Sequence, residues 1–232
     1  MDAGSCDGAA RRRLLGMTMV RFGLVVVLLG LGFFLPAGTL NYWQAWVFLA
    51  VLLVPMTAVM FYLVRNDPRL LERRLQIREK ERPQKLIVKL ASAFFIASWI
   101  LPGFDRRWGW SSVPPVLVPL ADAIFLGAYL FFFWVIRTNS YASRTVEVVA
   151  GQEVISTGPY ALVRHPMYLA IIVMYGAAPL ALGSYWALLA CAPVPFVLAL
   201  RLRNEEEVLL RDLPGYEEYR KKVPRKLIPG VW

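Results

Sequence analysis

Two long apolar stretches open the chain: FGLVVVLLGLGFFLPAGTL at residues 22–40 and WQAWVFLAVLLVPMTAVMFYLV at residues 43–64. Neither contains a charged residue, and each has close to the about 20 residues that a helix needs to cross a bilayer. Residues 86–103 and 116–136 form two further apolar stretches, each with a single charged residue. We therefore expect four firm membrane spans over these ranges.

A last apolar pair, residues 167–182 and 184–200, is also uncharged but shorter. The pair forms either two short spans or a helical hairpin that enters the membrane without a full crossing. Backbone groups in lipid must be hydrogen-bonded internally, which helices achieve within each segment. The sequence therefore predicts an all-α, polytopic transmembrane bundle of about five or six spans, with a cytoplasmic connector and C-terminal tail.

The composition excludes a soluble domain and argues against nucleic acid as a partner. The 232 residues are 58% hydrophobic and carry a formal net charge of +10. The positive charge is concentrated at residues 11–21 and 65–85, which are separated by two spans and so lie on one side of the membrane. The positive-inside rule makes that side cytoplasmic, together with both termini and the active site. We expect these basic segments to contact membrane lipids.

The chain has few residues that could bind a metal ion or form a disulfide. The chain has two cysteines, far apart and without a CxxC motif, and one histidine. No disulfide framework and no metal site is expected.

The chain divides into two regions of different character. Residues 1–115 hold the first spans and a basic cytoplasmic loop at 65–85, which is either a short interfacial helix or a solvated linker. Residues 116–232 form the expected catalytic membrane region. Its polar connector, residues 137–157, has an alternating pattern that suggests a short extended or hairpin-like piece. A connector of this length between helices is typical of a functional loop.

The only histidine lies in GPYALVRHPMY, residues 158–168. Pro166 suits the first position of a helix, so His165 is expected where that helix begins. The backbone N–H groups there lack partners within the helix and attract anions. Arg164 and His165 therefore suggest a receptor for a carboxylate or phosphate at the membrane surface.

A second cluster follows the last apolar stretch. Arg201 and Glu205 are spaced i,i+4 and share one helical face, and Glu205 is the first of three consecutive glutamates. Carboxylates near the end of a helix are unfavourable unless a cation compensates them. Arg201, Arg203, Arg164 or a cationic ligand could do so; otherwise the cluster is an ion pair beside a solvated acidic face.

The two clusters together resemble the isoprenylcysteine carboxyl methyltransferase family. The resemblance rests on the Gly-Pro-Tyr turn, on Arg-His-Pro-x-Tyr, and on Arg201, Glu205-Glu206, Leu209, the Tyr216/Tyr219 pair and the Leu-Ile-Pro-Gly ending, and covers about residues 137–232. It implies S-adenosylmethionine as methyl donor and a lipophilic, prenylcysteine-like acceptor. By the resemblance Arg201 faces the acceptor carboxylate and Glu205 is catalytic and also contacts the donor. The implied donor-binding residues are Gly158, Pro159, Tyr160, Val163, Arg164, His165, Tyr168, Glu205 and Glu206.

The chemistry is compatible with a site that has one histidine. When a carboxylate attacks a sulfonium, two opposite charges disappear, so a dry pocket and in-line positioning matter more than a general base. Three alternatives remain. A phospholipid amine N-methyltransferase is one, although Ser156-Thr157-Gly158 departs from the Gly-x-Gly turn of those enzymes. The others are a sterol-type reductase using reduced nicotinamide, whose relatives are longer, and a non-enzymatic lipid-binding protein.

Overall fold

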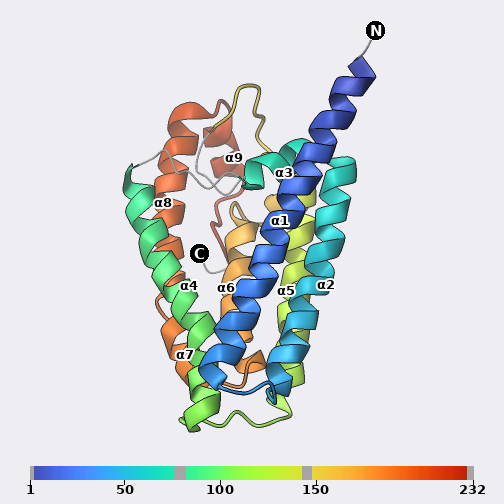
Figure 1. Cartoon of the computed structure of the whole chain (residues 1–232). Helices are drawn as coiled ribbons and strands as arrows, with labels where there is room; N and C mark the ends of the chain where they lie inside the picture. Colours follow the sequence, from blue (N-terminus) through green and yellow to red (C-terminus); the bar gives the residue numbers. More distant parts are fainter. Residues whose placement is uncertain (1–2, 76–81, 143–147, 229–232) are drawn as a thin grey trace.

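The computed structural model describes residues 3–75, 82–142 and 148–228, and within these ranges the chain is all-helical, as the sequence predicts (Figure 1). The helices, in chain order, are α1 (Ala3–Ala37), α2 (Trp43–Asn66), α3 (Pro68–Leu75), α4 (Arg82–Trp108), α5 (Leu117–Thr138), the 3₁₀ turn η1 (Gly158–Ala161), α6 (Pro166–Ala181), α7 (Tyr185–Cys191), α8 (Val194–Asp212) and α9 (Tyr216–Lys222).

Four segments in the described part of the chain are long and apolar enough to cross a membrane: Arg12–Ala37, Trp43–Asn66, Leu117–Thr138 and Tyr185–Asp212. Three of them overlap the predicted spans at 22–40, 43–64 and 116–136, and the fourth joins α7 to α8. The predicted span at 86–103 falls within α4, which is not among the four. Helix α6 has 16 residues, or about 24 Å at 1.5 Å per residue, which is short for a full crossing. The protein is a polytopic helical membrane bundle.

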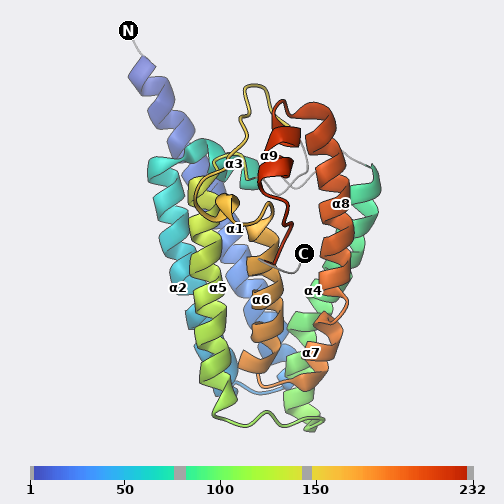
Figure 2. The same cartoon turned by 180° about the vertical axis from the view of Figure 1, so that it is seen from behind.

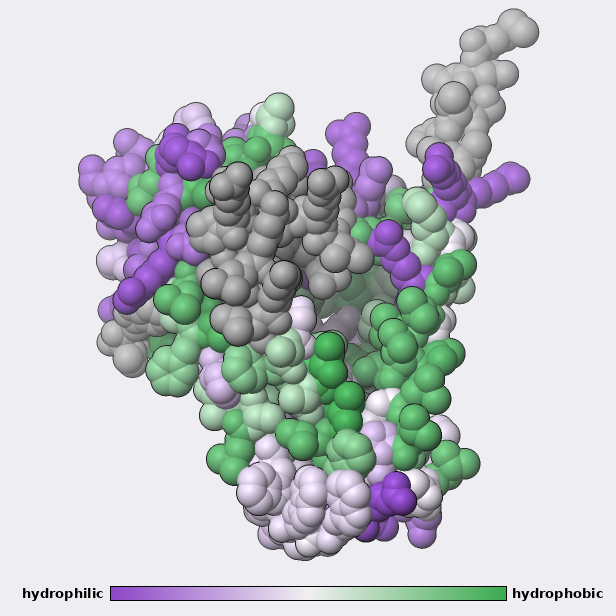
Figure 3. All heavy atoms as spheres, turned by 60° about the vertical axis from the view of Figure 1, so that its left-hand side comes forward, coloured by the Kyte–Doolittle hydropathy of each residue, from purple (hydrophilic) through white to green (hydrophobic). Residues whose placement is uncertain are grey.

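The outer surface of the bundle exposes large apolar side chains, as a surface in contact with lipid does. Many large apolar side chains of α1 are exposed, among them Leu24, Val27, Leu28, Leu31 and Leu35. Figure 3 shows hydrophobic residues along α1 and hydrophilic residues gathered at the end of the molecule that carries α9. The same view shows the face between α1 and α4 hollowed at mid-height. An exposed apolar belt with polar ends is the arrangement expected of a membrane-embedded bundle.

The helices pack side by side in one bundle, and the short helices α3 and α9 lie together at one of its ends (Figures 1 and 2). Helix α5 packs along α6 and α2, while α4 packs on α1 at one edge and on α7 and α8 at the other. Gly103 permits the close approach of α4 to α1, because a Cβ there would lie 2.6 Å from the carbonyl oxygen of Phe33. Figures 1 and 2 show α3, the connector before η1, and α9 together at the end from which the N-terminal part of α1 projects.

At the opposite end a buried carboxylate ties α4 to α7. Asp105 is 1% exposed, and it accepts hydrogen bonds from the backbone N–H (2.7 Å) and hydroxyl (2.5 Å) of Ser111 and from the hydroxyl of Ser184 (2.5 Å). Ser184 also caps α7 by accepting from the backbone N–H of Ala187. These bonds use both carboxylate oxygens and fix the turn between α6 and α7.

Of the two alternatives for residues 65–85, a short helix is present over Pro68–Leu75. Asp67 begins α3 by accepting from the backbone N–H of Leu70 (3.0 Å), and Leu70 and Leu71 are buried against the bundle. Arg73 and Arg74 donate to carbonyl oxygens of residues 140 and 142, so α3 also holds the end of α5. Residues 76–81 lie outside the described ranges.

The hairpin-like piece predicted in the connector is present only as a turn. The backbone N–H of Gln152 donates to the carbonyl of Val149, and the Val149 N–H donates to the Gln152 side chain. The described connector residues, 148–157, form no strand. Residues 143–147 lie outside the described ranges.

Candidate active site at the polar end

The Gly-Pro-Tyr turn forms η1, and α6 begins at Pro166, as the sequence predicts. His165 immediately precedes the helix with φ of −125°. Gly158 has φ of +56°, a conformation that favours glycine, and a Cβ there would lie 3.3 Å from Thr138. The turn therefore packs closely on the end of α5 and directs the chain into α6.

Residues 223–227, here called the C-terminal strap, pair with this corner. The backbone N–H groups of Arg164 and His165 donate to the carbonyls of Arg225 (3.0 Å) and Lys226 (2.9 Å). The Arg164 guanidinium donates through Nη1 to the carbonyl of Val223 (2.7 Å). The strap thus fixes the two residues that precede α6.

Glu206 on α8 is the centre of a buried ion cluster. Its Oε1 lies 2.7 Å from Nε of Arg164 and 3.3 Å from Nε2 of His165, and its Oε2 lies 2.9 Å from Nζ of Lys226. The expected cation is therefore present, with Arg164 as one of the predicted partners. Lys226 is an additional partner that no helical spacing in the sequence connects to Glu206.

Tyr168 links Arg201 to Glu205. The predicted i,i+4 pair lies on α8, but the tyrosine hydroxyl stands between the two side chains: it accepts from Nε of Arg201 (3.0 Å) and donates to Oε2 of Glu205. The other oxygen of Glu205 lies 4.0 Å from Nδ1 of His165. Residues from α6 and α8 thus form one polar network at the end of the bundle.

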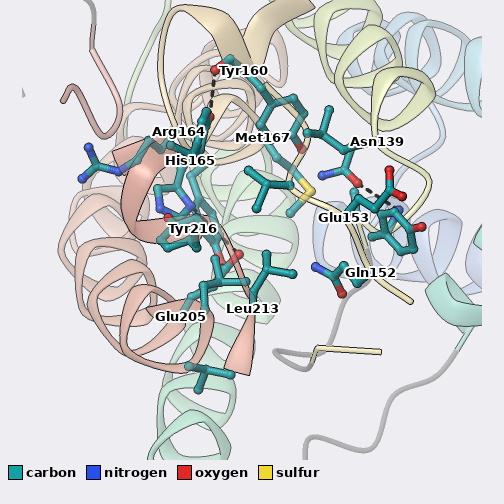
Figure 4. Close-up of a pocket in the computed structure, with 18 of the residues that line it drawn as sticks. Asn139, Gln152, Glu153, Tyr160, Arg164, His165, Met167, Glu205, Leu213 and Tyr216 are labelled. Carbon is teal, nitrogen blue, oxygen red and sulfur yellow. Dashed lines mark hydrogen bonds and ion pairs between the residues drawn. The ribbon is translucent and has the colours of Figure 1, made fainter. Parts of the chain in front are cut away.

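This network forms one wall of a cavity of about 840 Å³, a volume that includes the part open to solvent. Figure 4 shows His165, Glu205 and Tyr216 on one side and Asn139, Gln152 and Glu153 on the other, with the Arg164 guanidinium directed away from Gln152 and Glu153. The lining also includes Tyr141, Ala142, Val154, Ile155, Tyr160, Arg164, Met167, Tyr168, Arg201, Val208, Leu209, Leu213 and Tyr219.

The structure brings most of the predicted site residues together. Tyr160, Arg164, His165, Tyr168, Arg201 and Glu205 line the cavity. Gly158, Pro159, Val163 and Glu206 do not line it; the first three build the corner, and Glu206 holds the ion cluster behind His165.

The sequence did not identify the individual residues of the opposite wall of the cavity. Asn139, Tyr141, Gln152 and Glu153 come from the end of α5 and from the connector. The length and polarity of the connector were the available signal, but neither feature identifies individual residues.

Buried phenols complete the cavity. Burial raises the pKa of Tyr160 to about 12, and burial also raises the pKa values of Tyr216 and Tyr219, so all three are protonated hydrogen-bond donors at neutral pH. Tyr219 donates to the carbonyl of Tyr160 (2.7 Å) and so ties α9 to η1. Within the described structure the buried hydroxyl of Tyr216 has no partner. Such a group beside a cavity is available to a ligand.

Among the described residues, no group of three or more His, Cys, Asp or Glu side chains is placed to hold a metal ion.

Residues 117–214 match the model of the phospholipid methyltransferase family. The matched range runs from α5 through the connector and η1 to the end of α8 and so contains both sequence clusters. A search of curated proteins finds no match. The match indicates an integral membrane methyltransferase, a class that includes relatives of the isoprenylcysteine carboxyl methyltransferases, and it supports the sequence resemblance at that level.

Proposed function

We propose that the protein transfers a methyl group from S-adenosylmethionine to a lipophilic acceptor at the polar end of the bundle. The observation that carries the proposal is the cavity itself, where cationic, anionic and phenolic groups from α6, α8, α9 and the connector converge. This mixture suits a donor that has a carboxylate, an ammonium group, a sulfonium and ribose hydroxyls. The donor supplies the electrophilic methyl group.

The groups of this chain fit such a donor. The buried Tyr216 hydroxyl, which has no partner among the described residues, can donate to it. Glu205 and Glu153 offer acceptors to ammonium or hydroxyl groups on the two sides of the cavity. Tyr160 and Met167 contribute apolar surface that can exclude water. In this proposal Gly158, Pro159, Val163 and Glu206 support the donor site from behind.

Arg201 is proposed to bind the acceptor as a carboxylate. It lies one helical turn before Glu205 on α8, within the segment long enough to cross the membrane, so an acceptor arriving from the bilayer would meet the guanidinium before the donor site. Tyr168 accepts from Nε of Arg201 and thereby orients the guanidinium. A carboxylate held in line needs no proton removal, so the work of the protein is positioning in a water-poor cavity.

A phospholipid amine is the second candidate acceptor, favoured by the family match. An ammonium headgroup must lose a proton before it attacks a methyl group, and two possible proton acceptors of the cavity, Nδ1 of His165 and Oε1 of Glu205, lie 4.0 Å apart. The co-location of Arg164, His165, Arg201 and Glu205 counts against a lipid-binding scaffold without catalysis.

The test is transfer of labelled methyl from S-adenosylmethionine, with farnesylcysteine, fatty acids and amine lipids offered in parallel. We expect Arg201→Met to lose roughly 10- to 100-fold in turnover, since a charged hydrogen bond contributes roughly 1.5–3 kcal/mol. Arg203→Met, at an exposed position on the same helix, is the matched control and should retain activity. Normal turnover in Arg201→Met would remove Arg201 from the acceptor site.

We also propose that the polar end faces the cytoplasm. Arg12, Arg13 and Arg21 of α1 and the arginines of α3 lie at this end, as the positive-inside rule requires. In intact cells a membrane-impermeant thiol reagent should label Trp110→Cys at the opposite end and leave Arg220→Cys on α9 unlabelled. The reverse pattern would invert the orientation.

A further inference from the structure

The two ring nitrogens of His165 face two different carboxylates. Nε2 lies 3.3 Å from Oε1 of Glu206, and Nδ1 lies 4.0 Å from Oε1 of Glu205. The His165 side chain is 4% exposed, so most of the ring is in contact with protein. A neutral imidazole has one donor and one acceptor nitrogen, and its partners decide which nitrogen carries the hydrogen.

Glu206 determines the outcome for Nε2. Its charge is already matched by Arg164 at 2.7 Å and Lys226 at 2.9 Å, so the cluster does not require a third positive charge on His165. An ionised carboxylate can only accept hydrogen bonds. In the neutral ring Nε2 therefore donates to Glu206, and Nδ1 is the acceptor on the side of Glu205.

The gap between Nδ1 and Glu205 is then lined by two acceptors. A separation of 4.0 Å is too long for a direct hydrogen bond. Oε2 of Glu205 accepts from Tyr168, so Oε1 is the oxygen turned toward His165. A nitrogen about 2.9 Å from both atoms would see them at roughly a right angle, which two N–H bonds of one ammonium group can serve.

We infer that Glu206 is a positioning residue that holds His165 as the Nε2–H tautomer, so that Nδ1 of His165 and Oε1 of Glu205 form a binding site for a primary ammonium group. Glu206 does not line the cavity and acts through His165. The inference rests on the proposed function for its two ammonium sources: the amino-acid end of the methyl donor, and the headgroup of an amine lipid.

The tautomer can be measured directly because His165 is the only histidine of the chain. The full chain, labelled with ¹⁵N-histidine, purified through a histidine-free tag and placed in lipid nanodiscs, should give one pair of ring signals by NMR. We expect a protonated Nε2 and an unprotonated Nδ1. A protonated Nδ1, or protonation of both nitrogens at neutral pH, overturns the inference without any mutation.

The variant Glu206→Gln should move a measurable fraction of the proton to Nδ1, because the amide can donate to Nε2. Glu207→Gln makes the same chemical change one residue further along α8 at an exposed position, and should leave the wild-type signals unchanged. An unaltered His165 spectrum in a folded Glu206→Gln protein would show that Glu206 does not set the tautomer.

Binding measurements separate the two ammonium sources. If the donor's amino group occupies the site, S-adenosylhomocysteine should bind at least about tenfold more tightly than its analogue lacking the α-amino group, and Glu206→Gln should reduce that ratio. If a lipid headgroup occupies it, the two nucleosides should bind alike, and phosphatidylethanolamine added to phosphatidylglycerol nanodiscs should shift the Nδ1 signal.

Absence of both responses overturns the ammonium site. If S-adenosylhomocysteine does not bind the wild type at all, the proposed function fails. If it binds while Nδ1 is protonated, only the ammonium site fails.

Discussion

Arg164 lines the cavity, yet its hydrogen bonds run away from it, and this leads to a quantitative prediction. Its guanidinium donates to Glu206 (2.7 Å) and to the carbonyl of Val223 (2.7 Å). The side chain is 3% exposed, so water cannot replace either bond. We predict that Arg164→Met releases the C-terminal strap before it affects the contacts of a bound donor.

The magnitude follows from the burial. Removing one partner of a buried ion pair costs about 3–5 kcal/mol where the remaining charge is left unpaired. Because Lys226 still pairs with Glu206 at 2.9 Å in Arg164→Met, we expect a cost of at most about 3 kcal/mol here. At 1.4 kcal/mol per factor of ten, local opening of the strap should increase by up to about 100-fold. Where the strap's own opening free energy is smaller than this cost, the variant should open it completely.

Hydrogen–deuterium exchange with peptide resolution is the suitable assay. The backbone N–H groups of Arg164 and His165, which donate to the strap, should lose protection in Arg164→Met. Arg220→Met is the matched control, because Arg220 pairs with Glu217 on the surface at 3.2 Å. An exposed pair contributes about 0–1 kcal/mol, so exchange should change less than about fivefold. Unchanged exchange in Arg164→Met together with weakened S-adenosylhomocysteine binding would refute the reasoning and make Arg164 a direct ligand.

Three further predictions concern the same end of the molecule. Tyr168→Phe removes the hydroxyl that links Arg201 to Glu205, and a charged hydrogen bond of about 1.5–3 kcal/mol corresponds to a loss of roughly 10- to 100-fold in methyl transfer; equal turnover in wild type and variant would contradict this role. Gly158→Ala should destabilise the protein by about 1–2 kcal/mol, because alanine is strained at φ of +56°. Gly176→Ala, at a helical site with open space, should not, and thermal melting in nanodiscs compares the two variants. Burial raises the pKa of Tyr160 to about 12, so the contribution of the protonated phenol to stability should persist through pH 10 and be lost as the pH rises through 12. Absorbance titration of the wild type against Tyr160→Phe measures the ionisation of this phenol, and ionisation near pH 10 would refute the prediction.

Several features of the site could be predicted because they depend on neighbours in the sequence. Proline fixes φ and lacks an N–H, so Pro166 begins α6 and His165 must precede it. The i,i+4 spacing puts Arg201 and Glu205 on one face of α8. A cation near the consecutive glutamates was expected because they were placed near the end of a helix. Helix α8 in fact continues to Asp212, and the cations Arg164 and Lys226 compensate the buried charge of Glu206.

Contacts between distant segments could not be predicted in this way. Lys226 reaches Glu206 only because the chain turns at α9 and returns along the corner before α6. Tyr168 stands between Arg201 and Glu205 because α6 packs beside α8, a relation that no periodicity records. The opposite wall of the cavity depends on where the connector lies.

The sequence by itself determined that the chain is an all-helical membrane bundle, because apolar stretches of this length must satisfy their backbone hydrogen bonds as helices in lipid. The sequence also indicated the two clusters, at residues 158–168 and 201–206, that lie together at the candidate site. The tertiary structure decided the different positions of the two adjacent glutamates: Glu206 is held behind His165 by Arg164 and Lys226, while Glu205 faces the cavity. Two adjacent glutamates point about 100° apart on a helix, so only the packing of the neighbouring elements decides which of them meets the cations and which meets the cavity.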